Sequence, residues 1–337
     1  MRLVWRVALL AAALLAPNAG VAAAPLRQAS TATLTIITGQ AQVQPPGGSG
    51  FAPASDGQPV GVGARVRTGP GDRAVLTFFD GTTATLDPDT EISLDRVEPS
   101  GNPGGLLTGV GLAAGRVWAQ VTSLVERGSS FEVQAGSATA IGREGVTGYR
   151  VFPDGTVVCW DIDGAPMPVR TPSGEVELVA GQQITFPPGQ TSASPVPREF
   201  GPGVLEVQTS GPVLARLVNP DGLTTGFPLD DLVVNQLVDA STSLPGAEPR
   251  LVRVHGPLPG RHQLVLKADG SGPYTARVTL WLDNTPLFDR QWAATATPGV
   301  TLLADLTITA RDGVPSAAEV DEPRPLSDDP PGRFVTP

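Results

Sequence analysis

Three carboxylates alternate along one short segment, and this spacing is the nearest approach to a metal site in the chain. Asp87, Asp89 and Glu91 lie two residues apart, so on a strand their side chains would share one face. Oxygen ligands gathered on one face could hold Ca²⁺, but no twelve-residue loop ending in Glu accompanies them. Pro88 also indicates a turn or a strand edge. We therefore expect a solvated face, keep calcium binding as the alternative, and predict no metal or cofactor.

Residues that commonly serve as bases, nucleophiles or soft metal ligands are scarce. His255 and His262 are the two histidines, and no carboxylate lies at ligand spacing around them, which favours a structural role. Cys159 is the sole cysteine, so an intrachain disulfide and a thiolate metal site are excluded. Its apolar surroundings predict a buried, inert thiol. Because no nucleophile elbow, phosphate-binding loop or zincin helix is present either, we expect a protein that is not an enzyme.

Tryptophans are the remaining candidates for ligand contact, since their flat rings can form stacking surfaces. Trp118, Trp160 and Trp281 lie in strand-like runs, and we expect them to be core residues. Trp292 stands between Arg290 and a run of Ala and Thr. It is therefore the candidate for an exposed contact with a ligand.

The segments that must position these residues contain short apolar runs separated by turns. Gly and Pro make up 75 of 337 residues, and they alternate with runs rich in Thr, Val and Phe, while long amphipathic helical stretches are absent. This pattern predicts an all-β protein. An Asp-Gly pair between two such runs predicts a two-residue hairpin turn, with positive φ at both central residues. The predicted structural turns contain Gly69, Asp80, Gly81, Gly115, Asp154, Gly155 and Gly181.

The first residues have the pattern of an export signal. Arg2 and Arg6 frame a positive segment, an apolar run covers residues 7–16, and small residues at 21–23 suit cleavage. We predict a signal peptide at 1–23 and an exported mature protein, periplasmic, surface-located or secreted, that does not span a membrane. The net charge of −10 becomes −12 without the two arginines, since 21 basic residues then face 33 acidic ones. This balance argues against a nucleic-acid partner.

Composition divides the rest of the chain into four segments. A first β domain is expected at 31–190, and a Pro-rich linker at 191–202. About six strand-like runs at 203–311 have the lengths and spacing of a smaller, immunoglobulin-like β-sandwich. The acidic, Pro-rich end, 312–337, has almost nothing to bury and is expected to be disordered.

The order of motifs in the first block resembles the FecR domain family of bacterial envelope proteins. The resemblance covers about Leu34 to Gln183, and it implies a compact, non-enzymatic, all-β domain, either a short-strand solenoid or a twisted sandwich with glycines at its corners. Three positions depart from the family pattern: Arg143-Glu144-Gly145 replaces Arg-Gly-Thr, Asp163-Gly164-Ala165-Pro166 replaces a later Glu-Gly motif, and Ala64 replaces an Asp. The motifs are Gly39-Gln-Ala-Gln-Val43, Val66-Arg-Thr-Gly69, the strand ending in Asp80-Gly81, Leu112-Ala-Ala-Gly115-Arg-Val-Trp118 and Leu178-Val-Ala-Gly-Gln182.

The family resemblance leaves two functions open. The named role of the family is iron-transport signalling by an inner-membrane regulator, but here a cleavable signal stands where the cytoplasmic segment of such a regulator is expected. We therefore expect an exported binding or scaffold module for an envelope polysaccharide or a partner protein. The alternative is a periplasmic regulatory component of a FecR-type, iron-transport-like sensing system that works with a separate membrane partner.

Overall fold

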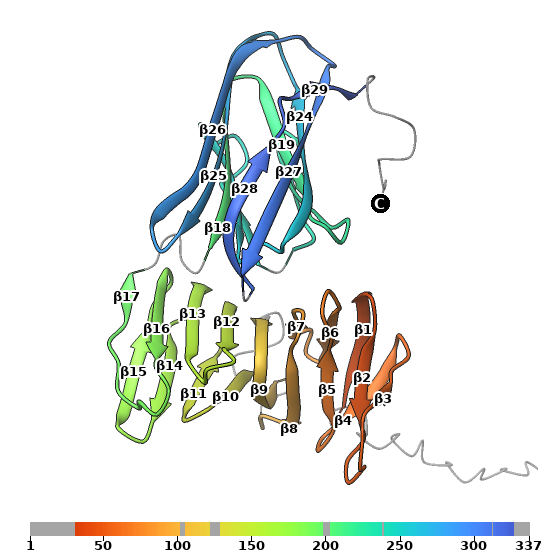
Figure 1. The fold of residues 1–337 in the computed structure, drawn as a ribbon, viewed down its shortest axis with the longest axis vertical. Helices are drawn as coiled ribbons and strands as arrows, with labels where there is room; N and C mark the ends of the chain where they lie inside the picture. Colours follow the sequence, from red (N-terminus) through yellow and green to blue (C-terminus); the bar gives the residue numbers. More distant parts are fainter. Residues whose placement is uncertain are drawn as a thin grey trace, which may run out of the picture.

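The computed structural model describes residues 31–101, 105–121, 129–197, 203–237, 239–311 and 313–326, and the predicted signal peptide lies outside these ranges. Every helix or strand element in them is a β-strand, which confirms the all-β prediction. The strands form an N-terminal body (31–197) and a C-terminal body (the described part of 203–326), stacked one above the other (Figure 1). None of the described segments is a helix that could cross a membrane.

The N-terminal body consists of two packed sheets, between which the chain passes repeatedly. Their pairing is antiparallel except for the parallel pair β9–β10, and their facing apolar side chains form one core. The upper sheet of Figure 1 has the order β4 (Gln58–Gly61), β1 (Thr31–Thr38), β6 (Arg73–Thr77), β7 (Thr83–Leu86), β9 (Leu106–Val121), β12 (Gly145–Val151), β13 (Val157–Gly164), β16 (Gln182–Phe186) and β17 (Val196–Pro197). The lower sheet has the order β3 (Ala52–Pro53), β2 (Ala41–Gln44), β5 (Arg65–Thr68), β8 (Glu91–Pro99), β9, β10 (Ser130–Ala135), β11 (Ala138–Gly142), β14 (Met167–Thr171) and β15 (Gly174–Leu178).

Strand β9 belongs to both sheets because it bends at Gly115. Residues 106–114 pair in the lower sheet, and residues 115–121 pair in the upper sheet. Gly115 has φ 85, and a Cβ there would lie 2.4 Å from the Cα of Thr90, so only glycine fits this corner. Gly145 and Gly164 pair with each other and also have positive φ. The chain thus keeps its corners at two positions where the motifs depart from the FecR pattern.

The Asp-Gly hairpin turns differ in detail from the prediction. Around Asp80-Gly81 the N–H of Gly81 donates to the carbonyl of Phe78, and the N–H of Phe78 donates to the carbonyl of Thr82. Gly81 has φ 83, whereas Asp80 keeps a negative φ and its carboxylate accepts the N–H of Thr82. The prediction of positive φ at both central residues is therefore wrong, because a three-residue turn with a single left-handed glycine forms instead.

The other predicted turn residues can be placed as well. Asp154-Gly155 repeats the Asp80-Gly81 geometry, with φ 87 at the glycine and the same pair of backbone hydrogen bonds. Gly181 lies in the turn before β16 with φ 81. Gly69 lies in the connection from β5 to β6 but does not adopt positive φ. It instead donates its N–H to the Asp72 carboxylate.

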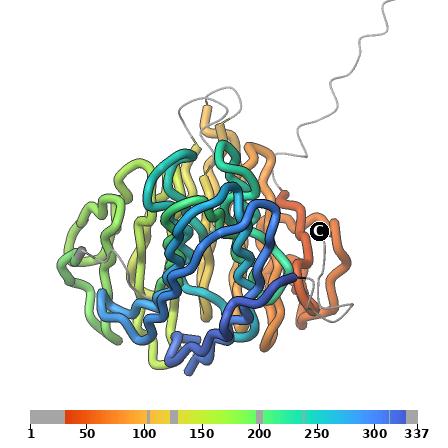
Figure 2. The backbone as a smooth tube through the Cα atoms, turned by 90° about the horizontal axis from the view of Figure 1, so that it is seen from above, coloured from red at the N-terminus to blue at the C-terminus, as the bar shows by residue number. Residues whose placement is uncertain are grey.

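The C-terminal body is a sandwich of two antiparallel sheets around a second apolar core. One sheet has the order β22 (Ala240–Thr242), β23 (Arg250–His255), β18 (Val204–Ser210), β25 (Gly272–Leu282) and β26 (Thr285–Ala296). The other has the order β21 (Leu232–Asn235), β20 (Thr224–Leu229), β19 (Val213–Val218), β24 (Gly260–Ala268), β27 (Thr301–Arg311) and β28 (Val314–Val320), with β29 (Arg324–Pro325) also paired to β27. From above, this body covers the middle of the N-terminal body, whose two ends project on either side (Figure 2).

The predicted segment boundaries at both ends of the C-terminal body need revision. Within the predicted linker, Val196–Pro197 pairs with β16, so the upper sheet extends past residue 190. The prediction that 312–337 is disordered is wrong for residues 313–326, since β28 and β29 both pair with β27. Pro315 is buried against the sandwich, and Ala318 and Val320 pack partly buried against its core. The burial of these three residues is not evident from the sequence, because acidic residues surround them.

Replacing Gly81 with valine tests the turn geometry. We expect Gly81→Val to destabilise the protein by roughly 1–3 kcal/mol, because a β-branched residue is strained at positive φ. Gly61→Val is the matched control, since Gly61 has ordinary φ and the nearest atom to a new Cβ is 3.9 Å away. Denaturant unfolding of both variants measures the difference. Equal midpoints for Gly81→Val and the unsubstituted protein would contradict the turn assignment.

Candidate functional site at the interface of the two bodies

Side chains on the outer face of the upper sheet form three rows, because residues paired across neighbouring strands point the same way. The C-terminal body covers this face (Figure 1). The arginine row contains Arg73, Asp87, Arg116, Arg150 and Val158. The indole row contains Val75, Thr85, Trp118, Gly148 and Trp160. The groove row contains Thr83, Gln120, Val146 and Asp163.

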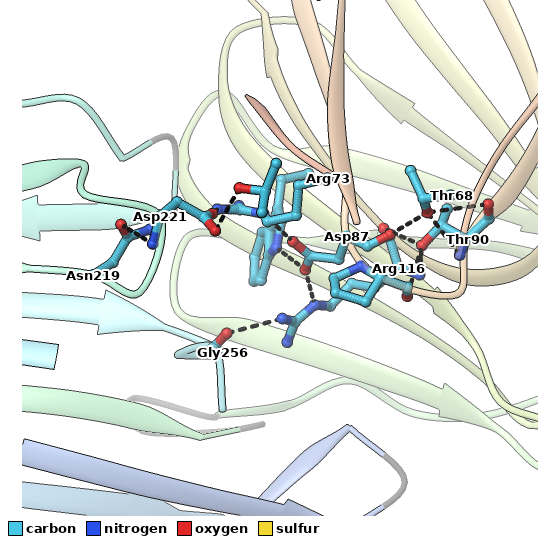
Figure 3. Close-up of polar contacts among 11 residues, drawn as sticks. Thr68, Arg73, Asp87, Thr90, Arg116, Asn219, Asp221 and Gly256 are labelled. Atoms are coloured by element: carbon cyan, nitrogen blue, oxygen red, sulfur yellow. Dashed lines mark hydrogen bonds and ion pairs between the residues drawn. The ribbon is translucent and has the colours of Figure 1, made fainter. Parts of the chain in front are cut away.

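Each arginine of the arginine row binds a different loop of the C-terminal body. Arg73 Nη1 lies 2.7 Å from Asp221 Oδ2. Arg116 Nη2 donates to the carbonyl of Gly256 at 2.9 Å (Figure 3). Arg150 Nη1 donates to the carbonyl of Gly313 at 3.1 Å. Three strands of one body are therefore fixed to three loops of the other by charge-assisted hydrogen bonds.

Asp87 lies between two of these arginines and balances their charge. One carboxylate oxygen accepts Arg73 Nε at 3.1 Å, and the other accepts Arg116 Nε and, at 3.0 Å, Trp118 Nε1 (Figure 3). Asp87 is only 2% exposed. Burial alone would raise the pKa of this carboxyl, yet Arg116 and Arg73 hold it below its usual range. Asp87 is therefore an ionised group at the centre of the interface.

This position corrects the prediction of a solvated carboxylate face. Asp89 has φ 55 and lies in the turn that leads from the upper to the lower sheet. Beyond the turn, Glu91 pairs with Arg65 on the lower sheet. The three carboxylates therefore lie on different parts of the fold. Within the described ranges, no three His, Cys, Asp or Glu side chains are grouped to hold a metal ion.

Asp221 is presented to Arg73 by the turn Asn219–Gly222, for which no sequence pattern indicates a functional role. The Asn219 side chain accepts the N–H groups of Asp221 and Leu223 at 3.0 and 2.8 Å. Both oxygens of Asp221 are then used across the interface, since Thr38 Oγ1 donates to Oδ1 at 2.7 Å. The Asn-Pro-Asp-Gly motif could have identified the turn, but not its partner in the other body.

A third carboxylate, Asp239, is buried within electrostatic reach of Arg73, Asp87 and Arg116. Burial raises the pKa of Asp239 to about 6, with Arg73 acting in the opposite direction. Burial alone would lower the pKa of Arg73, but Asp87, Asp239 and Asp221 raise it above its ordinary value. Arg73 therefore stays charged beside these carboxylates.

The indole row packs Trp118 against Trp160 over a glycine. Their rings stack with centroids 5.8 Å apart and an interplanar angle of 22°. Between them lies Gly148, where a Cβ would come within 2.6 Å of Trp118 and 2.8 Å of Trp160. Trp160 Nε1 donates to Gln183 at 2.8 Å. Both rings are fully buried, as expected, but they lie between the two bodies and not inside the core between the sheets.

Trp292 and Cys159 lie away from the arginine and indole rows, whereas His255 precedes Gly256 and donates its backbone N–H to the carbonyl of Asp239. Trp292 is half-buried on the edge strand β26 and packs against the sandwich core, so its ring is not an open surface. Burial lowers the pKa of His255 and of His262 to about 4. Cys159 is buried, and burial raises the pKa of its thiol to about 12. The thiol is therefore unreactive at neutral pH.

Asp87→Asn tests the charge balance of the arginine row. Removing the charge leaves two buried guanidinium groups undercompensated, so we expect a loss of about 3–5 kcal/mol in unfolding free energy. Glu91→Gln breaks the more exposed pair with Arg65 and should cost about 1 kcal/mol or less. Chemical denaturation of both variants provides the comparison. A similar loss for the two substitutions would mean that Asp87 has no special structural role.

Separating the two bodies should expose the side chains of the indole row to solvent. In the two-body protein with the substitutions W281F and W292F, Trp118 and Trp160 are the tryptophans of the mature chain. Residues 31–197 contain the same pair. We expect red-shifted emission and easier iodide quenching in the fragment, because the C-terminal body no longer covers the rings. Identical spectra would show that the interface does not bury them in solution.

Asp161 gives a pH-dependent prediction. Neither of its buried oxygens has a hydrogen-bond partner among the described residues, and burial raises its pKa to about 7, with Asp163 adding to the effect. A carboxyl whose pKa is higher in the folded state than in the unfolded state stabilises the folded protein at pH values below the unfolded-state pKa. This contribution is lost as the pH rises through the folded-state pKa. Asp161→Asn should therefore gain stability relative to the parent between about pH 4 and 7, by on the order of 1–3 kcal/mol.

The control for Asp161→Asn is Asp154→Asn. The N–H of Thr156 lowers the pKa of the exposed Asp154 carboxyl, so its stabilising contribution is present at high pH and is lost in acid. Thermal unfolding from pH 4 to 8 should show stability differences of opposite sign for the two variants. A pH-independent difference for Asp161→Asn would show that its carboxyl is not desolvated in the folded protein.

Comparison with known proteins gives a partial match. Two crystal structures of a candidate anti-sigma factor from Parabacteroides distasonis ATCC 8503 are similar at 17% and 16% identity, each with a TM-score of 0.34, covering 40% of this chain and 59% of that chain. The chain thus spans less than two thirds of that protein, and no curated protein matches it. The family described as FecR protein matches residues 64–161. The segment that carries most of the arginine and indole rows therefore matches the FecR family, as the motif order predicted.

Proposed function

We propose that this chain is an exported, non-catalytic regulatory component of a FecR-type sensing system, acting through a separate membrane partner. The observation that carries the proposal is the FecR match at 64–161. Most strands of the outer face that binds the C-terminal body lie in this segment, so the FecR region and the sandwich act as one unit. The signal-peptide pattern at 1–23 supports export.

The positions of the tryptophans favour this regulatory role over the binding of a surface polymer. Stacking on sugar rings requires exposed flat aromatic surface. Trp118 and Trp160 are fully buried between the bodies, and Trp292 is half-buried against the sandwich core. Trp292, the candidate stacking surface, is therefore occupied by contacts within the protein.

A deletion strain of the source organism tests the proposal. We expect loss of the gene to change a defined set of transcripts, and plasmid expression of the full chain to restore them. A version lacking residues 2–23 is the matched control and should fail to restore them, since it is not exported. Transcripts that stay unchanged in the deletion strain would contradict the regulatory role.

The polymer-binding alternative makes a separate prediction. Mature protein would then co-sediment with purified envelope polysaccharide, soluble glycan would compete, and Trp292→Ala would weaken the interaction. We expect the protein to remain in the supernatant. Competed sedimentation together with an unchanged transcript profile would replace the regulatory proposal with the polymer-binding one.

A further inference from the structure

The two bodies do not close completely over the groove row, and a cavity of about 380 Å³ remains between them. Its floor is the groove row of the upper sheet, with Thr85 and Arg73 beside it. Residues of the C-terminal body between 223 and 240, including Leu237, form the other wall. The cavity is therefore built jointly by the FecR region and the sandwich.

Strand register shows that the floor of this cavity runs across four strands. Thr83, Gln120, Val146 and Asp163 are successive cross-strand partners on β7, β9, β12 and β13. Three strand spacings of about 4.8 Å give a floor roughly 14 Å long. An extended polypeptide advances about 3.3 Å per residue, so the floor accommodates roughly four residues.

Several polar groups along the cavity have unused hydrogen-bonding capacity. The hydroxyls of Thr83 and Thr85 and the amide of Gln120 have no partner among the described residues. Arg73 uses Nε and Nη1 but leaves Nη2 unpaired. Asp163 uses one oxygen to accept the N–H of Val146, at 2.8 Å. Donors and acceptors are thus spread along the floor, which suits the alternating N–H and C=O groups of a peptide.

We propose that this groove binds an extended peptide segment of the partner protein, an inference that rests on the proposed regulatory function. At one end the unpaired Nη2 of Arg73 offers a donor to a peptide oxygen, and Asp163 at the other end favours a basic residue. Apolar wall residues such as Leu237 provide space for a hydrophobic side chain between them. An oligosaccharide fits less well, since no aromatic ring among the described residues lines the groove.

The test uses a positional-scanning library of fluorescein-labelled, end-capped hexapeptides, with binding to the mature protein followed by fluorescence polarisation. We expect selection for a basic residue near one end of the hexapeptide, where Asp163 lies. Gln120→Trp should fill the groove and weaken binding of the best hexapeptide at least tenfold. Gln134→Trp is the matched control, because Gln134 is an exposed glutamine on the lower sheet, and it should change affinity less than twofold.

Thr83→Tyr blocks the same floor independently, so the result does not depend on one variant folding correctly. Absence of binding by every hexapeptide pool, or equal affinity in the Gln120 and Gln134 variants, would overturn the groove assignment. Binding of short labelled oligosaccharides, without binding of any hexapeptide, would also overturn the groove assignment. If no peptide binds but the deletion strain shows restorable transcript changes, the groove proposal fails while the regulatory function stands. Peptide binding without transcript changes would support the groove proposal and contradict the regulatory function.

Discussion

The relative placement of the two bodies depends on the ionised carboxylate of Asp87. Arg73 and Arg116 are buried beside it, and a buried guanidinium requires both a counter-charge and partners for its N–H groups. Asp87 provides the charge for both, and one further N–H donor group of each arginine binds Asp221 or Gly256 of the other body. Such buried ion clusters contribute little to stability compared with apolar packing, but moving one member leaves a buried charge without its partner. They therefore fix one relative orientation of the bodies.

The indole row depends on the same arrangement. Trp118 donates to Asp87 and stacks on Trp160, and this stacking is permitted by the absent side chain at Gly148. Arg150, from the same strand as Gly148, reaches the carbonyl of Gly313. The start of the C-terminal segment that composition assigns to a disordered tail is thus part of the interface. Polar and aromatic contacts are combined within one continuous face.

Local sequence patterns were sufficient to predict the fold class, the FecR region and the burial of Cys159. They failed where contacts between residues far apart in the sequence determine the structure. Asp87, Asp89 and Glu91 have the spacing of a shared strand face, but the Pro88-Asp89 turn sends Asp87 and Glu91 to different sheets. The partner of Arg73 is 148 residues away in sequence, and no pattern around either residue indicates it. Likewise, β28 was missed because its apolar residues bury only against β27 and the sandwich, not against each other.

The sequence separation of the interface partners has a consequence for folding. Arg73, Arg116 and Arg150 are synthesised long before Asp221, Gly256 and Gly313, so the face that they occupy stays uncovered until most of the chain exists. Contacts between residues so far apart form late, since a long loop must be closed first. An unfinished chain therefore exposes two adjacent indole rings to solvent. The growing polypeptide is most vulnerable to aggregation during this interval, and a chaperone that shields aromatic surface would act on it then.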